Sequence, residues 1–148
     1  MKRVAPRSAR STLAHGQLVA GGGGLGLLVA SFLPWYSAGG EDATAWQAFS
    51  VTDLFIAAAA AAGLILGAVV LLRLSVSYPV AGSAVATLFG AIALVLIVVR
   101  LVDPPGQGLD RELGAWLGLV FAGAITVGGY LGMQDQAASG RDLMAKPY

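Results

Sequence analysis

Few side chains in this chain could perform chemistry, and they lie outside the middles of its apolar segments. The only histidine, His15, stands in a basic N-terminal stretch, and six of the eight acids fall in two segments that we expect on the other side of a membrane. A histidine-dependent triad with those acids is therefore excluded. The chain has no cysteine, so it has no thiol nucleophile and no thiolate metal site. We expect that it is not an enzyme.

Metal and cofactor sites are also not expected. The six acids lack the alternating oxygen spacing of a calcium-binding loop, so capping and solvation explain them better. The glycines Gly21, Gly23 and Gly26 match a dinucleotide-binding pattern, but they lie inside an apolar segment rather than between a strand and a helix. The acids concerned are Glu41, Asp42, Asp53, Asp103, Asp110 and Glu112.

Arg100, Asp53 and Asp103 form the one constellation of charges that the sequence singles out. Arg100 closes an apolar segment, Asp53 opens another at the same expected depth, and Asp103 follows Arg100 within one helical turn. An arginine in a membrane needs an acidic partner or a route to water. Two interpretations stay open: Arg100 pairs with one of these acids and locks two helix ends, or it extends alone to the interface.

Four apolar segments must position these residues. The clearest, Leu54–Leu72, has no polar side chain and would form a helix about 28 Å long, close to the thickness of a bilayer core. Hydrophobic residues make up 57% of the chain and charged residues 11%, unlike a soluble domain. We predict an all-α membrane protein, an antiparallel bundle of four transmembrane helices within residues 18–133. The expected spans are about 18–36, 54–72, 79–100 and 112–133.

The distribution of positive charge predicts the orientation. Seven of the nine Lys and Arg residues lie in the tails 1–17 and 134–148 and in the link at Arg73, whereas the other two connecting segments hold only Arg100 and Arg111. Because positive charge favours the cytoplasm, we predict both termini there, with the tails polar and mobile, in the cytoplasmic membrane of a bacterium. The basic N-terminal tail could also contact anionic lipid.

The first apolar segment allows a second interpretation. A basic start, an apolar middle and small residues are also features of a cleaved signal peptide. The segment nevertheless continues to Pro34, Trp35 and Tyr36, which would end the helix with aromatic anchors rather than a cleavage site. With Trp46 and Trp116, Trp35 is expected at the outer membrane–water interface.

Capping residues predict where helices begin on the outer side. Thr44 and Gln47 form a capping-box pattern that would start a short helix, and Ser50 and Asp53 form another at the start of the second span. Asp110 is placed to cap the fourth span.

Glycines at four-residue or eight-residue spacing are expected to hold the helices together. Apolar burial cannot associate helices in lipid, but close backbone contact at small residues can. Such spacing occurs in every expected span, which favours tight packing within one chain or between copies. The glycines are Gly22, Gly26, Gly63, Gly67, Gly82, Gly90, Gly114 and Gly118, with a further pair at Gly128 and Gly132.

The order of these motifs resembles a group of small four-span membrane proteins of actinobacteria. The shared features lie between residues 18 and 133. The resemblance implies the four-span architecture and a distinctive outer face, and it brings no activity. The motifs are Phe32-Leu-Pro-Trp-Tyr36, Ala45-Trp-Gln-Ala-Phe-Ser-Val-Thr-Asp53, Arg100-Leu-Val-Asp-Pro-Pro105, Gly114-Ala-Trp-Leu-Gly118 and Gly128-Gly-Tyr130.

Three classes of function remain open. The first is a non-enzymatic structural or accessory protein that contacts the lipid bilayer and packs against itself or another membrane protein. The second is a small transporter or channel subunit, although no ionisable residue lies near the middle of a span. An enzyme acting on lipid is the least favoured, because no nucleophile–base pair is visible. The net charge of +1 gives no reason to expect nucleic acid as a partner.

Overall fold

The computed structural model describes residues 7–48, 51–72 and 79–144 and is mostly helical. These residues form five helices and one small sheet, so the chain is mostly helical as predicted but is not all-α. Four of the five helices are long, and the fifth is the short helix expected to start near Thr44. In chain order the elements are α1 (Arg7–Ser31), β1 (Pro34–Ala38), β2 (Glu41–Thr44), α2 (Ala45–Ala48), α3 (Val51–Leu71), α4 (Pro79–Val102), β3 (Asp110–Arg111) and α5 (Leu113–Met144).

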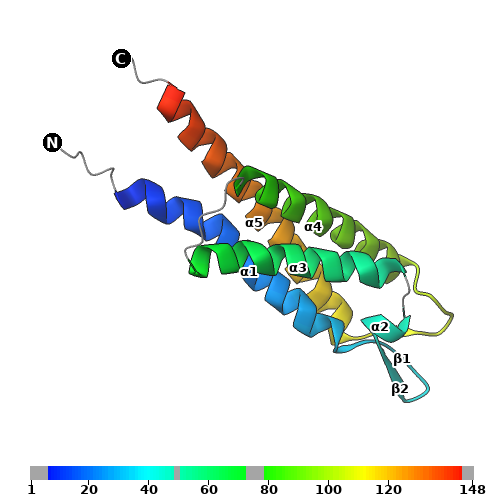
Figure 1. Cartoon of the computed structure of the whole chain (residues 1–148). Helices are drawn as coiled ribbons and strands as arrows, with labels where there is room; N and C mark the ends of the chain where they lie inside the picture. Colours follow the sequence, from blue (N-terminus) through cyan, green and yellow to red (C-terminus); the bar gives the residue numbers. More distant parts are fainter. Residues whose placement is uncertain (1–6, 49–50, 73–78, 145–148) are drawn as a thin grey trace.

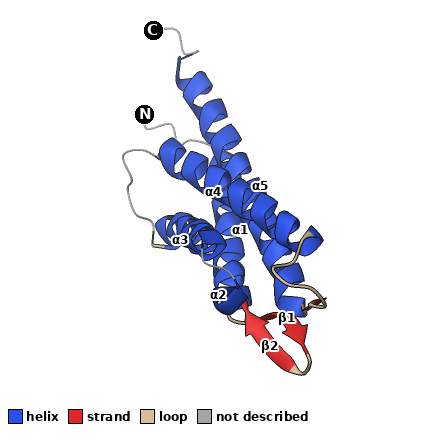
Figure 2. Cartoon of the chain, turned by 90° about the vertical axis from the view of Figure 1, so that its right-hand side faces the viewer, coloured by secondary structure: helices blue, strands red, loops and turns tan. Residues whose placement is uncertain are grey.

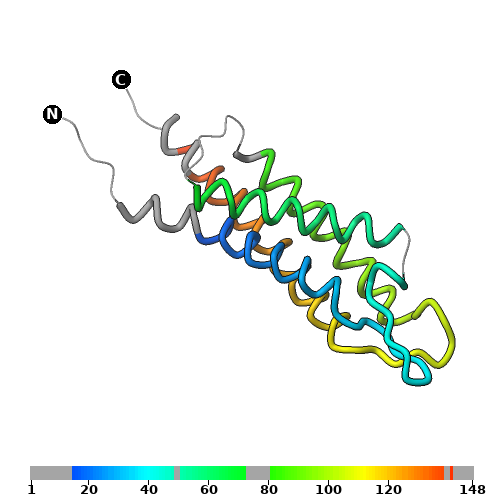
Figure 3. Tube along the Cα trace, turned by 60° about the horizontal axis from the view of Figure 1, so that its bottom comes forward, coloured from blue at the N-terminus to red at the C-terminus, as the bar shows by residue number. Residues whose placement is uncertain are grey.

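The long helices α1, α3, α4 and α5 lie side by side and run alternately up and down (Figures 1 and 3). Helix α1 packs against α3 and α5, and α4 packs against the same two helices from the other side. The first turns of α1 and the last turns of α5 lie at one end, which we call the terminus end. The strands and α2 lie at the opposite end, the sheet end (Figure 2).

Three helices of the described chain are long and apolar enough to cross a membrane, namely Val51–Leu71, Ala81–Val102 and Leu113–Ala138. They coincide with the predicted second, third and fourth spans. Their outward-facing side chains are large and apolar, as at Ile65 and Val95. Soluble monomers rarely expose apolar surface continuously in this way, so these helices identify a membrane-spanning protein.

The first and last helices, α1 and α5, are longer than predicted at the terminus end. Helix α1 begins at Arg7 rather than Leu18, and α5 continues to Met144 rather than ending near Met133. The predicted polar tails are therefore helical over much of their length. Hydropathy marks the part of a helix that suits lipid, whereas Ala, Gln, Arg and Met continue the helix beyond it.

A three-stranded antiparallel sheet, which was not predicted from the sequence, closes the sheet end. Strand β1 lies in the centre, between β2 and β3. The β1–β2 turn holds Gly39 and Gly40 at φ 61° and 91°, a left-handed conformation that glycine adopts without strain. A Gly-Gly pair is a two-residue hairpin turn signal, and here it joins Pro34–Ala38 to Glu41–Thr44. It was hidden by the expectation that Trp35 and Tyr36 would anchor a helix end.

Glycines bring α1 into backbone contact with α3. A Cβ on Gly21 would lie 2.6 Å from the Cα of Gly67, and one on Gly24 would lie 2.7 Å from the nitrogen of Leu64. The predicted packing role of Gly67 is therefore confirmed. That of Gly22 is wrong, because nothing lies within 4 Å of a Cβ built there. Gly21 and Gly24, rather than Gly22, face α3.

The other predicted glycines all lie against a neighbour. Gly63 contacts α1, Gly26 contacts the Phe121 ring of α5, and Gly82 contacts α3 through a leucine side chain. Gly90 packs against α5, where a Cβ would lie 2.8 Å from the Thr126 hydroxyl. Small residues thus allow close approach along each of these helix pairs.

Candidate functional site at the sheet end

The sheet end closes the C-terminus of α4 with side chains from two strands. The hydroxyl of Tyr36, on β1, donates to the Arg100 carbonyl at 2.8 Å. Nε of Arg111, on β3, donates to the Leu101 carbonyl at 2.6 Å, and its Nη2 lies 3.5 Å from the Val102 carbonyl. A helix leaves its last carbonyls without intrahelical partners, so these contacts satisfy groups that would otherwise need water.

The environment of Tyr36 keeps its hydroxyl protonated. The residue is 1% exposed and contributes to the core. Burial raises the pKa of the phenol above its ordinary value, and the nearby positive charges of Arg100 and Arg111 lower it by a smaller amount. A neutral phenol is the form that donates a hydrogen bond, so Tyr36 acts as a structural donor.

Trp35 joins the end of α1 to α5. Its indole Nε1 donates to the Ala30 carbonyl at 2.8 Å, and its side chain is fully buried. A Cβ on Gly114 would lie 2.7 Å from the Trp35 ring, and one on Gly118 would lie 2.6 Å from it. The predicted exposed anchor is therefore a core residue, and the predicted packing glycines Gly114 and Gly118 make room for it.

Trp46 and Trp116 are the tryptophans that remain on the surface, at 40% and 52% exposure. The Trp46 ring lies 5.9 Å from that of Phe32, centroid to centroid, and its Nε1 donates to the Ser31 hydroxyl at 3.1 Å. Ser31 in turn donates to the Leu28 carbonyl at 2.6 Å. This chain of donors fixes α2 against the last turn of α1.

The short helix α2 begins as predicted. The Thr44 backbone N–H donates to Oε1 of Gln47 at 3.0 Å, which is the reciprocal half of a capping box. The corresponding prediction at the start of α3 involves Ser50, which lies outside the described residues. Asp53, its partner in the pattern, occupies the first turn of α3.

The start of α5 differs from the prediction. Asp110 lies in β3, where it pairs with Ser37 of β1, and does not cap the helix. Glu112 stands directly before α5: its carbonyl accepts from the Ala115 N–H at 3.2 Å, and its N–H donates to the Trp35 carbonyl at 2.9 Å. The Ser37 hydroxyl donates to the Glu112 carboxylate at 2.6 Å. The pairing with β1 displaced the cap by two residues.

Asp53, Arg100 and Asp103 all lie at the sheet end, on the first turn of α3 and the last turn of α4. Asp53 is 7% exposed, and its Oδ1 has no hydrogen-bond partner in the part of the chain that is described. Asp103 is exposed, and its N–H continues the helix by donating to the Val99 carbonyl at 2.7 Å. The pairing of Arg100 with either acid stays a prediction.

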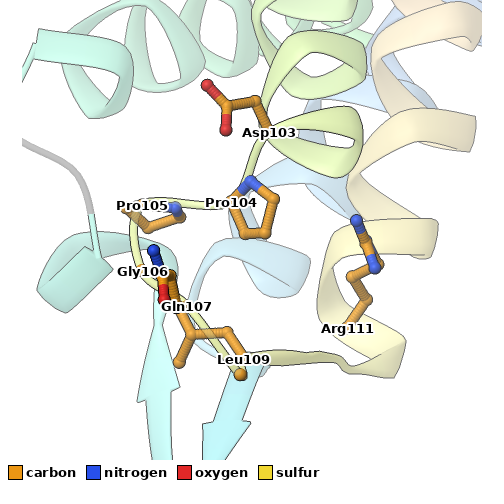
Figure 4. A pocket seen from close by; sticks show the side chains of 8 residues that line it. Asp103, Pro104, Pro105, Gly106, Gln107, Leu109 and Arg111 are labelled. Atoms are coloured by element: carbon orange, nitrogen blue, oxygen red, sulfur yellow. The ribbon is translucent and has the colours of Figure 1, made fainter.

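The loop between α4 and β3 surrounds an open hollow of about 570 Å³ (Figure 4). Asp103 and Arg111 border it on opposite sides, and the Arg111 guanidinium extends toward the end of α4. Across the described ranges, no group of three His, Asp or Glu side chains could hold a metal ion.

Tyr36 and Arg111, which organise this end, were not predicted from the sequence to act together. The sequence predicted only a local role for each: Tyr36 as an aromatic anchor at the end of a helix, and Arg111 as one of two basic residues in the outer connecting segments. Their shared role depends on the sheet, which brings together segments distant in the sequence. No family model matches the chain, and no curated protein and no solved structure is significantly similar to it.

Proposed function

We propose that the chain is a four-span protein of a bacterial cytoplasmic membrane that works by contact with other membrane components and not by catalysis. In this proposal α1 also crosses the membrane, as the first of four spans, both termini lie in the cytoplasm, and the sheet end faces outward. The outward-facing Leu25 and Val29 of α1 are more than half exposed and apolar, which suits lipid contact. The resemblance to small four-span membrane proteins of actinobacteria agrees with this arrangement.

The non-enzymatic proposal rests on one observation: the polar side chains at the sheet end donate hydrogen bonds to carbonyls at the ends of helices. Tyr36 and Arg111 donate to the end of α4, and Trp35 donates to the end of α1. Groups engaged in this way hold the fold and are not free to attack or protonate a substrate. They hold the strands and α2 in place at the sheet end, and we call the resulting surface, which includes Phe32, Trp46 and Trp116, the platform.

Exposed aromatic side chains on this platform suit a protein partner. Phe32 is 64% exposed, Trp46 40% and Trp116 52%. Aromatic residues are enriched at protein interfaces because they bury much apolar area with little loss of side-chain freedom. The partner would be a second copy of the chain or another membrane protein.

Photo-crosslinking in native membranes tests the proposal. A photoreactive phenylalanine placed at position 46 or 116 is expected to give one discrete protein adduct, identified by mass spectrometry. The control is the same residue at position 95, where Val95 is 60% exposed in the apolar part of α4. Equal adduct patterns at positions 46, 116 and 95 would reject the platform as a docking surface.

A transporter or channel subunit is the second candidate, favoured by two buried polar atoms. Oδ1 of Asp53 and Oγ of Ser83 are both without hydrogen-bond partners among the described residues. Polar groups buried in membrane helices often mark a path for ions or solutes. Solute flux in liposomes that disappears in Asp53→Asn, while Asp110→Asn keeps it, would support transport; absence of flux for the unaltered protein would reject it.

A further inference from the structure

We propose that a groove between α1 and α3 binds one acyl chain of an anionic phospholipid, whose headgroup lies at the basic start of α1. The inference rests on the proposed function in one respect, because α1 must lie in the bilayer. It adds a specific lipid site on the half of the protein opposite the sheet end.

The groove is apolar and open along one side. It has a volume of about 390 Å³ and is walled by Leu18 and Leu25 of α1 and by Leu64 and Leu71 of α3. The walls run in opposite directions, so Leu18 and Leu71 lie at its terminus-side end. Polar atoms are nearly absent from its lining, so it suits hydrocarbon rather than a polar solute.

Consecutive glycines of α1 explain why the groove exists. Gly21 contacts Gly67 of α3, so the two backbones meet with no side chain above the seam. Gly22 is exposed, and a Cβ added to it would have no atom within 4 Å. The groove beside the contact between α1 and α3 therefore stays open. A larger residue at position 22 would fill the groove without touching the packed interface.

The dimensions favour an acyl chain over a helix as the occupant. From Leu18 to Leu25 a helix rises about 10 Å, which covers much of one leaflet's apolar depth of about 15 Å. A volume of about 390 Å³ over that length gives an opening about 6 Å across. A helix with side chains is about 10–12 Å wide, so it could only lie across the groove, whereas a single acyl chain is narrow enough to lie along it.

The basic sequence that precedes the groove favours an anionic headgroup. His15, Leu18, Gly22 and Leu25 recur at helical spacing and are all exposed, so His15 stands on the groove's face one turn beyond it. Residues 1–17 contain four Lys and Arg residues and no acid, and two of these cations lie in the first turns of α1. Basic residues beside a membrane helix on the cytoplasmic side attract anionic lipid.

Native mass spectrometry of the full chain tests the proposal. The protein is reconstituted into vesicles of phosphatidylglycerol and phosphatidylcholine with identical acyl chains, then released gently, and the retained lipids are counted. We expect one phosphatidylglycerol retained at least several-fold in preference to phosphatidylcholine. Gly22→Leu should lower that retention about tenfold, because the leucine occupies the position of the acyl chain.

Gly123→Leu is the matched control. Gly123 lies in α5 and, like Gly22, has nothing within 4 Å of an added Cβ, so both variants add the same side chain to open space. Equal retention by Gly22→Leu and Gly123→Leu would overturn the groove as the site. A dimer that Gly22→Leu dissociates would place a second copy there and would also overturn it.

Charge reversal tests the headgroup separately. Replacing both α1 cations, as Arg7→Glu with Arg10→Glu, should remove the preference for phosphatidylglycerol. Equal retention of the two lipids by the unaltered protein would overturn the anionic assignment. Cysteines placed at positions 15 and 41 can be labelled to show on which side of the membrane each lies. If no lipid is retained but these two positions are labelled on opposite sides, the lipid site is rejected and the four-span proposal stands. Labelling of both on one side would reject the spanning α1 itself.

Discussion

Tyr36 and Arg111 are direct partners across the β1–β3 pair, and both reach the end of α4. Tyr36 donates to the carbonyl of Arg100, and Arg111 donates to that of Leu101. Adjacent strands thus cap successive carbonyls of one helix, and the positive guanidinium also complements the negative end of the helix dipole. The sheet is therefore the C-terminal cap of α4, made from segments on either side of that helix.

Removing the Arg111 side chain should destabilise the protein. Arg111→Met would leave the Leu101 carbonyl without its side-chain donor, and because Arg111 is itself exposed and water can replace part of the contact, the cost should be about 0.5–1.5 kcal/mol. Thermal unfolding in a single detergent measures the change. Arg141→Met is the control, because Arg141 is exposed like Arg111 but donates to the Ala137 carbonyl of its own helix rather than to the end of another helix. If both variants unfold at the same temperature, the cap contributes nothing measurable.

Tyr36→Phe should cost about 1 kcal/mol, because it removes a single neutral hydrogen bond and keeps the ring. The Arg100 carbonyl would lose its donor, and the core volume would hardly change. Equilibrium unfolding by denaturant in mixed micelles gives the free energy. Tyr130→Phe, on an exposed residue of α5, serves for comparison and should change the stability less.

Alkaline pH should lower the stability of the folded protein, because the Tyr36 phenol then loses its proton. The folded pKa of Tyr36 is raised by burial, while the unfolded phenol ionises near its ordinary value of 10.0. The folded state therefore holds the proton more tightly, so stability is unchanged below pH 10.0 and falls as the pH rises above it. Ultraviolet titration of tyrosinate should show one late-ionising group, absent in Tyr36→Phe. A normal titration of all tyrosines would contradict this expectation.

The sequence predicted the apolar helices well because their signal is local and redundant. Any window of Leu54–Leu72 indicates a membrane helix, and the structure places α3 there. The sheet end could not be predicted in the same way. Tyr36 and Arg111 are far apart in the chain, and their strands are short, so only the folded arrangement reveals that they share a helix end. Capping at Thr44 was predictable, since both partners lie within four residues.

Glycine positions show a finer limit of sequence reasoning. A four-residue spacing identified Gly63 and Gly67 correctly but could not choose among the consecutive glycines of α1. Each residue turns the helix face by about 100°, so neighbouring glycines face different partners. Gly21 faces α3, Gly23 faces α5, and Gly22 faces outward.

Alanine substitutions should therefore separate these glycines. Gly67→Ala would bring a Cβ to 2.8 Å from the Gly21 Cα, which forces α1 and α3 apart and should cost more than about 1 kcal/mol. Gly22→Ala meets open space and should be neutral or stabilising by up to about 1 kcal/mol, from helix propensity alone. Unfolding temperatures in one detergent provide the comparison. A larger loss at Gly22 than at Gly67 would contradict the packing of α1 on α3.

Labelling from outside the cell should establish the orientation, because the chain has no native cysteine and single cysteines can be placed at will. Glu41→Cys is exposed at the sheet end, whereas His15→Cys and Ala138→Cys are exposed at the terminus end. A membrane-impermeant maleimide applied to intact cells is expected to label only Glu41→Cys. After lysis it should label all three, which shows that each cysteine is reactive.

Because His15 and Glu41 flank the apolar part of α1, opposite labelling of these two positions requires that α1 cross the bilayer. Labelling of Ala138→Cys in intact cells would reverse the orientation predicted from the basic residues, and labelling of all three in intact cells would contradict a membrane-spanning arrangement.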